Sequence, residues 1–257
     1  MTEHVLVEKA EKLLVLTLNR PEKKNALTRA MYKTLAAEIA AADTNPDIRC
    51  IVIMANGDMF TAGNDLADFA AIGSAAPAPK PEDGNPLLPA LAHARKPIVA
   101  AVNGRAVGIG VTMLLHCDMV YLANDASLIT PFVNLALVPE AASSLLMPLR
   151  IGHARAFEMF VLGEPVSAEK AVSWGIANRT APPADLHRIA RATAAAIAAR
   201  APAAVVATKT LMRDEKVLLA RMSEEGAHFG RQLKTAEFKE AFTAFSERRP
   251  PDFSKFG

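Results

Sequence analysis

Two glycine-containing segments of the chain offer backbone N–H groups where a strand gives way to a helix. One is Ala62-Gly63-Asn64-Asp65, and the other begins at Gly108. Amides at a helix start have no partner inside the helix, and the helix dipole favours negative charge there. If the two starts converge, their N–H groups could stabilise one developing oxyanion. Two ordinary helix starts would give the same pattern, and spacing alone favours this simpler interpretation.

An acidic residue, Glu140, follows Pro139 in an otherwise apolar stretch. Taken alone, this dipeptide predicts a helix with the proline at its first position and the glutamate in its first turn. A carboxylate there interacts favourably with the helix dipole, by about 0.3–1 kcal/mol. On the residues alone, Glu140 is therefore interpreted as a helix-start acid.

Other patterns with chemical potential are absent or incomplete. The chain has no Gly-x-x-x-x-Gly-Lys-Ser/Thr phosphate loop and no Gly-x-Ser-x-Gly nucleophile elbow. The glycines at 108 and 110 resemble a dinucleotide fingerprint, but Met113 occupies the third glycine position. His116-Cys117-Asp118 lies between apolar segments, which indicates a packed helix end. No metal site is expected.

The elements that must position these groups alternate between strands and helices. Thr28 is a plausible N-cap for a helix to about Ala42, and the chain beyond Asp185 is alanine-rich and helical. This pattern predicts an α/β fold with a largely parallel sheet covered on both faces. The strands expected from apolar runs are Leu13–Leu18, Cys50–Met54, Ile98–Val102 and Met119–Leu122. The helices expected in the C-terminal part span residues 186–200, 203–212 and 215–247.

One long loop interrupts this order. Residues 73–89 contain five prolines, which predicts a segment without regular structure between two helical segments. We expect this loop to be mobile.

Composition narrows the class of protein. The chain has 257 residues, 51% of them hydrophobic, which excludes a disordered polymer. Lys and Arg total 29 against 27 Asp and Glu, which excludes a globally basic nucleic-acid-binding surface. No apolar run of about 18 residues occurs, so no membrane span is expected. Cys50 and Cys117 suit buried reduced thiols, and the N-terminus lacks a signal-peptide pattern, so we expect a cytoplasmic protein.

Four motifs, in order along the chain, carry a family resemblance. They are NRPEKKNAL at 19–27, FTAGNDL at 60–66, KPIVAAVNGRAVG at 96–108 and GEPVSAEKAVSWGIAN at 163–178. Together they resemble the crotonase, or enoyl-CoA hydratase/isomerase, superfamily across essentially the whole chain. The resemblance implies a spiral of ββα units over residues 1–200. It also implies a C-terminal helical region over 201–257 that assembles homotrimers or dimers of trimers.

The same resemblance implies the ligand and the residues that hold it. Substrates would be acyl-CoA thioesters of lipid metabolism, with coenzyme A as part of the substrate and no separate cofactor. The oxyanion hole would use the backbone N–H groups of Asn64 and Ile109. Each lysine of the implied CoA-binding set could equally be a solvated surface charge. The residues implied in CoA binding are Arg20, Lys23, Lys24, Ala62, Asp65, Leu66 and Lys255.

Two positions that lack a glutamate and one position that has a glutamate indicate which reaction is catalysed. Hydratases of this family place glutamates at two positions that here hold Thr112 and Phe132. Addition of water needs one group to activate it and another to deliver a proton, so both losses count against hydration. Glu140 stands where the Δ3,Δ2-enoyl-CoA isomerases of the family carry a single catalytic glutamate.

The resemblance therefore favours a Δ3 to Δ2 enoyl-CoA isomerase with Glu140 as its catalytic base. The substrate pocket would include Thr112, Phe132, Leu135 and Leu137, and its apolar part would raise the pKa of Glu140. Two alternatives stay open. One is an enoyl-CoA hydratase or another reaction of the family, and the other is a catalytically silent acyl-CoA-binding member.

Overall fold

A computed structural model describes residues 4–65 and 85–257 of the chain. Within these residues a six-stranded sheet has the order β1-β2-β3-β4-β6-β9. Its members are β1 (Val5–Ala10), β2 (Leu13–Leu18), β3 (Cys50–Ala55), β4 (Ile98–Val102), β6 (Met119–Ala123) and β9 (Arg179–Ala181). Only the β1–β2 pair is antiparallel among these described strands, so the predicted, largely parallel sheet is confirmed.

The central strands are apolar throughout because both faces of the sheet are covered. Every residue of β2, β3 and β4 is buried, which explains their continuous apolar runs in place of an alternating pattern. The β1–β2 hairpin closes through Glu11 and Lys12, which both have positive φ, as a tight two-residue turn requires.

A second, smaller sheet runs beside the first. Its order is β5-β7-β8, from β5 (Arg105–Val107), β7 (Ser127–Ile129) and β8 (Val166–Ser167). The chain passes from β4 in the large sheet to β5 in the small one, and then into α4 (Ile109–Thr112). The passage from β6 to β7 repeats this step, which gives the expected ββα unit. The three short strands were not predicted, because runs of two or three residues show no clear period.

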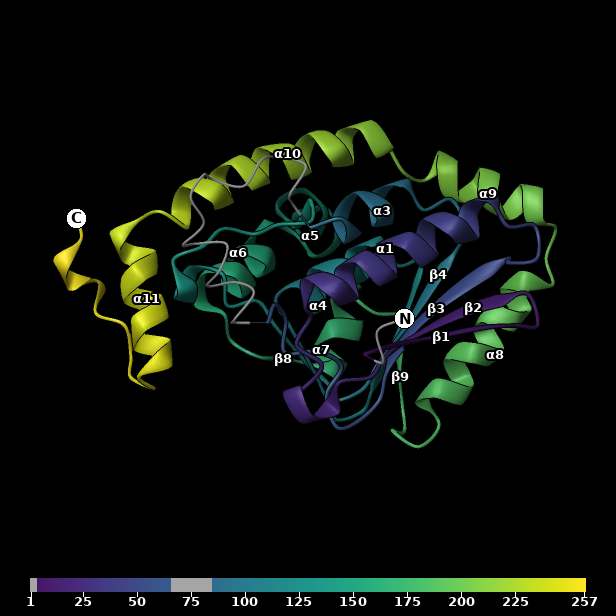
Figure 1. The fold of residues 1–257 in the computed structure, drawn as a ribbon, viewed down its shortest axis with the longest axis horizontal. Coiled ribbons are helices and arrows are strands. Elements are labelled where there is room, and N and C mark those ends of the chain that lie inside the picture. The colour runs from purple at the N-terminus through teal and green to yellow at the C-terminus, as the bar shows by residue number, and fades with distance from the viewer. Residues whose placement is uncertain (1–3, 66–84) are drawn as a thin grey trace.

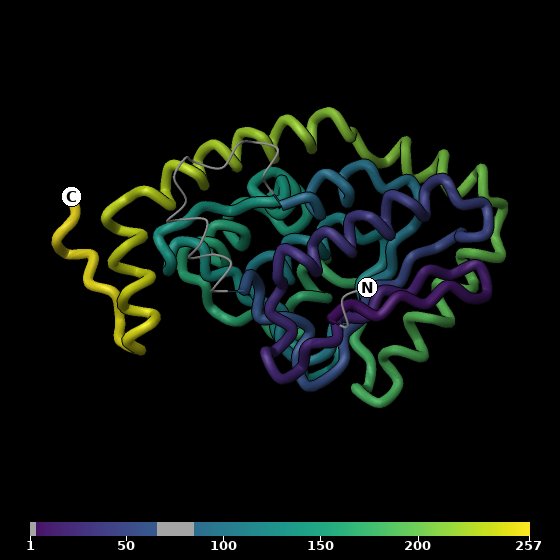
Figure 2. The backbone as a smooth tube through the Cα atoms, viewed as in Figure 1, coloured from purple at the N-terminus to yellow at the C-terminus, as the bar shows by residue number. Residues whose placement is uncertain are grey.

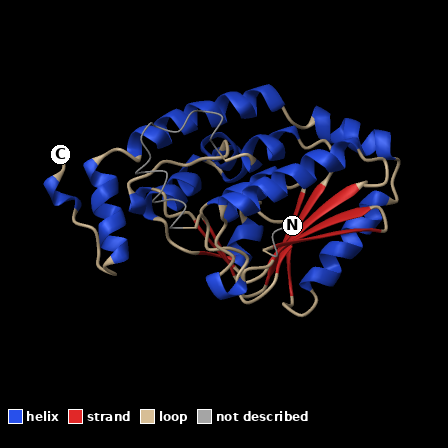
Figure 3. Cartoon of the chain, in the orientation of Figure 1, coloured by secondary structure: helices blue, strands red, loops and turns tan. Residues whose placement is uncertain are grey.

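Helices cover both faces of the large sheet (Figure 3). α1 (Arg29–Thr44) begins as predicted, since the Thr28 side chain accepts a hydrogen bond from the Met31 N–H at 3.3 Å. α8 (Leu186–Ala198) packs against β3, β4 and β6. The remaining helices are α3 (Leu87–His93), α5 (Ser143–Ile151), α6 (His153–Leu162), α7 (Ala168–Ser173), α9 (Pro202–Leu211), α10 (Glu215–Gln232) and α11 (Ala236–Ser246).

The C-terminal helices extend along one side of the core and beyond it. Figure 2 shows α10 passing over the core and α11 lying at one end of the molecule. The predicted division at residue 200 falls in the break between α8 and α9, and the role of residues 201–257 in assembly stays a prediction. No single helix in the described ranges is long and apolar enough to cross a membrane; the α8–α9 pair, bent by 105°, passes that test by length and composition only.

One predicted boundary is wrong. The loop expected over 73–89 ends earlier, because α3 begins at Leu87 and includes Pro89. Pro89 lies in the first turn of the helix, where a residue without an N–H group costs no intrahelical hydrogen bond. Residues 73–84, and the helix expected to open at Leu66, lie outside the described residues.

Candidate active site

Two glycines with positive φ set the conformation of the predicted oxyanion hole. Gly63 has φ +90° and precedes Asn64, and Gly108 has φ +55° and precedes Ile109. Among the described residues, neither the Asn64 N–H nor the Ile109 N–H donates to a backbone or side-chain acceptor. Both amides are therefore available to an external acceptor.

The two glycine segments touch each other. The Val107 N–H donates to the Thr61 carbonyl oxygen at 3.1 Å. A Cβ atom on Gly63 would lie 3.1 Å from the Val107 oxygen, and one on Gly110 would lie 2.4 Å from the Thr61 side chain. The glycines thus permit a close approach that larger residues would prevent, and the two segments lie side by side. That their two N–H groups converge on one acceptor stays a prediction.

Two further side chains, which were not predicted to have a role, hold the first segment. The Tyr32 hydroxyl donates to Asn64 Oδ1 at 2.6 Å and fixes the Asn64 side chain. Asn25 is fully buried, and its amide nitrogen donates to the carbonyl oxygens of Asn56 and Met59. The Asn25 carbonyl in turn accepts from the Thr61 hydroxyl at 2.7 Å. The position of Asn25 in the first family motif was the available signal for its importance.

Glu140 reaches the same place from a distant part of the chain. The Thr112 hydroxyl, on the helix that begins at Ile109, donates to Glu140 Oε1 at 2.5 Å. Burial raises the pKa of Glu140 to about 8, the Thr112 hydrogen bond acts in the opposite direction, and the charge of Glu225 raises the pKa further. A carboxyl group with this pKa can accept and return a proton near neutral pH.

The structure corrects the helix-start interpretation of Glu140. Glu140 precedes α5, whose first residue is Ser143, so it is not in the first turn of a helix that begins at Pro139. Ala141 and Ala142 follow it with φ of +62° and +55°, which turns the chain before the helix begins. Glu140 is therefore presented by a tight turn.

The other predicted pocket residues fall into two groups. Phe132 is buried and packs edge-on against Phe160, with ring centroids 6.0 Å apart. Leu135 and Leu137 join a separate apolar cluster with Phe238 of α11. The contact of these three side chains with an acyl group, and with Glu140, stays a prediction.

The predicted CoA-binding cations are partly engaged with acids. Arg20 pairs with Asp65 at 2.6 Å, and Lys24 pairs with Asp58 at 2.7 Å at an exposed position. Lys23 is exposed on the same turn, and this turn adjoins the oxyanion segment because the Ala62 N–H donates to the Lys24 carbonyl. Leu66 lies outside the described residues.

The fourth predicted CoA-binding cation, Lys255, lies elsewhere, in the C-terminal tail. Lys255 pairs with Asp252 in the C-terminal segment. Figure 1 shows this segment beyond α11, at the end of the molecule marked C, whereas the purple turn that follows β2 lies near the middle. Within one chain the structure does not bring Lys255 beside the 20–24 turn, and its part in CoA binding stays a prediction.

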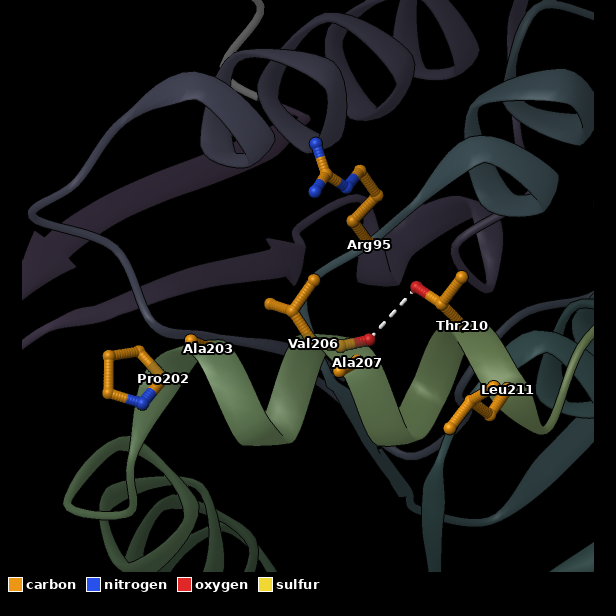
Figure 4. A pocket seen from close by; sticks show the side chains of 7 residues that line it. All are labelled: Arg95, Pro202, Ala203, Val206, Ala207, Thr210 and Leu211. Carbon is orange, nitrogen blue, oxygen red and sulfur yellow. Dashed lines mark hydrogen bonds between the residues drawn. The ribbon is translucent and has the colours of Figure 1, made fainter.

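A surface cavity of about 600 Å³ lies away from this site. Figure 4 shows that its lining comes from α9, with Arg95 facing the helix across the hollow. None of its lining residues belongs to the predicted site. Among the described residues, no group of three His, Cys, Asp or Glu side chains could hold a metal ion.

The candidate site thus combines a ββα fold with two glycine segments whose following N–H groups have no acceptor among the described residues. Residues 8–255 match the family model for enoyl-CoA hydratase/isomerase. The chain belongs to this family, the crotonase superfamily, and is an acyl-CoA enzyme.

Individual relatives carry different activities in their names. The chain is 35% identical to a probable enoyl-CoA hydratase of Rhodobacter capsulatus, over 99% of both chains. It is 30% identical to the 1,2-epoxyphenylacetyl-CoA isomerase of Escherichia coli, again over 99% of both chains. A crystal structure of an enoyl-CoA hydratase/isomerase from Pseudoalteromonas atlantica superposes with a TM-score of 0.92 at 42% identity, over 98% of this chain and 100% of the other.

Proposed function

We propose that the protein is an enoyl-CoA isomerase that moves a double bond from Δ3 to Δ2. The observation that carries this proposal is the pairing of one carboxyl group, Glu140, with the helix that presents the Ile109 N–H. The two positions at which the family's hydratases carry glutamates hold Thr112 and Phe132. One acid is enough for an isomerase, because the same group serves as base and then as acid.

The reaction begins with the thioester oxygen between the N–H groups of Asn64 and Ile109. These donors stabilise the negative charge that develops on this oxygen when the C2–H bond breaks. Glu140 takes the C2 proton, the electron pair forms a dienolate, and the protonated Glu140 returns a proton at C4. The double bond then lies between C2 and C3, and no water is consumed. Coenzyme A enters as part of the substrate, and the proposal needs no other cofactor.

A hydratase is the second candidate, and the names of relatives such as the Rhodobacter capsulatus protein favour it. Parallel assays of trans-3-hexenoyl-CoA and crotonyl-CoA separate the two. We expect isomerisation of the first and slow or no hydration of the second. Rapid hydration of crotonyl-CoA would refute the single-base mechanism, and binding of both esters without turnover would indicate a silent acyl-CoA-binding protein.

A further inference from the structure

A second buried carboxylate, that of Glu225, accepts hydrogen bonds from the turn that carries Glu140. Glu225 of α10 is only 5% exposed. One of its carboxylate oxygens accepts the Ala142 N–H at 2.6 Å, and the other accepts the Ser144 N–H at 2.8 Å. These amides lie at the start of α5, where the helix itself supplies no acceptor. Glu225 thus caps α5, although it lies more than eighty residues further along the chain.

The turn needs such support because its backbone is unfavourable. Ala141 and Ala142 both have positive φ, a backbone conformation that is unfavourable for residues with a side chain. Each of the two alanines has one backbone group held by a buried side chain. His116 Nε2 donates to the Ala141 carbonyl at 2.7 Å, and Glu225 accepts from the Ala142 N–H.

The protonation of His116 fits this role. Burial lowers the pKa of His116 to about 3, so the ring is neutral. With the proton on Nε2, which donates to Ala141, Nδ1 is free to accept from Arg213 at 3.0 Å. The turn is therefore held by two side chains, the neutral ring of His116 and the carboxylate of Glu225, and we call these two contacts the clamp.

The helix that carries Glu225 is fixed against the core. Leu218 of α10 is buried in a cluster with Ala92 of α3 and Ala142 of the turn itself. Figure 1 shows α10 passing over α3 and α5. The carboxylate is thus held on a packed helix, and its position relative to the turn is set by that packing.

We propose that Glu225 is a positioning residue that directs Glu140 toward the substrate by holding the backbone of the next residues. This inference rests on the proposed role of Glu140 as the base. In this proposal Glu225 does not touch the reacting atoms. It acts on Glu140 by holding the backbone of residues 141–144. Its charge also raises the pKa of Glu140, while Thr112 lowers that pKa and Arg221 of α10 faces Glu225.

The experiment compares Glu225→Gln with Glu224→Gln, which removes the same charge from the adjacent, exposed position. For Glu225→Gln we expect kcat for 3-hexenoyl-CoA isomerisation to fall about 10- to 100-fold, with KM changed less than about twofold. Hydrogen–deuterium exchange should become faster in the peptide covering 141–147. Glu224→Gln should leave kcat, KM and this exchange at their wild-type values.

The other outcomes would overturn the positioning role of Glu225. Wild-type kcat in Glu225→Gln, or a loss seen only in KM, would overturn the proposal. If Glu225→Gln fails to fold, Glu225→Asp keeps the charge but withdraws it by one methylene group, and full activity in that variant would overturn it as well. Fast exchange of the Ala142 and Ser144 amides in the wild type would refute the clamp directly.

The exchange measurement separates this inference from the proposed function. A wild-type protein that does not isomerise 3-enoyl-CoA would refute the function. Faster exchange at 141–147 in Glu225→Gln, but not in Glu224→Gln, would still establish the clamp in that case. Isomerisation in the wild type with no change in Glu225→Gln would refute the positioning role alone.

Discussion

The two halves of the candidate site reach unusual backbone conformations by different means. The oxyanion segments use Gly63 and Gly108, for which positive φ carries no penalty from a side chain. The turn after Glu140 uses two alanines in the same region of backbone space, and holds them with side chains from α10 and from the turn after α4. The first half is specified by adjacent residues, and the second by contacts between distant ones.

This difference has a consequence for how each half fails. A defect in a glycine segment should misplace one N–H group and leave the carboxyl group in position. A defect in the turn should misplace the base while the thioester carbonyl still binds. Variants in the two halves are therefore expected to affect different steps.

The largest effect is expected from the base itself. Glu140→Gln keeps the size of the side chain and its hydrogen bond to Thr112, but the amide cannot accept the C2 proton. We expect kcat for 3-hexenoyl-CoA to fall about 10²- to 10⁴-fold. The dissociation constant of a non-reactive acyl-CoA, measured by calorimetry, should stay close to that of the wild type. An unchanged rate would remove Glu140 from the mechanism and leave only the oxyanion half of the site.

The next effect tests the glycine half. Gly63→Ala forces a side chain into a φ of +90° and places its Cβ 3.1 Å from the Val107 oxygen, so the Asn64 N–H must shift. Loss of one oxyanion donor lowers kcat about 10²- to 10³-fold. Gly152→Ala is the matched control, since Gly152 has φ +83° but no atom within 4 Å of the new Cβ. Equal losses of activity in both variants would mean that general backbone strain, and not the position of the amide, is responsible.

The large sheet could be predicted from sequence because its signals are local. Apolar runs marked β2, β3, β4 and β6, and Thr28 marked the start of α1. The roles proposed for Asn64 and Ile109 came from the family motifs, because glycine spacing alone favoured two ordinary helix starts. A strained alanine pair gives no such signal, because alanine is rare at positive φ and nothing in the sequence marks these two as exceptions.

The contacts of Glu140 could not be predicted from the sequence, for a related reason. Pro139 predicted a helix that begins at the proline, whereas α5 begins at Ser143, where Glu225 accepts hydrogen bonds from the first amides. No spacing rule connects residues 142 and 225, and His116 was interpreted only as part of a packed helix end. Tertiary contacts of this kind become visible only when the helices are placed.

Thr112 is the residue that links the two halves, and its removal should have the smallest effect. Thr112→Val deletes the hydroxyl that donates to Glu140, a bond that favours the ionised carboxylate. The pKa of Glu140, already raised to about 8 by burial, should then rise further. Because the base acts when ionised, kcat/KM increases with pH, and its rising limb should move to higher pH by the same amount.

At pH 7, kcat/KM should fall about tenfold for each pH unit by which the limb moves, while the rate at high pH recovers. The measurement is the pH dependence of kcat/KM, which reports the free enzyme. Thr193→Val is the control. Thr193 of α8 also has a hydrogen-bonded hydroxyl, which it shares with Tyr121 of β6. A limb that does not move would show that packing alone joins the Glu140 turn to the helix of Ile109, and that the two halves are electrostatically independent.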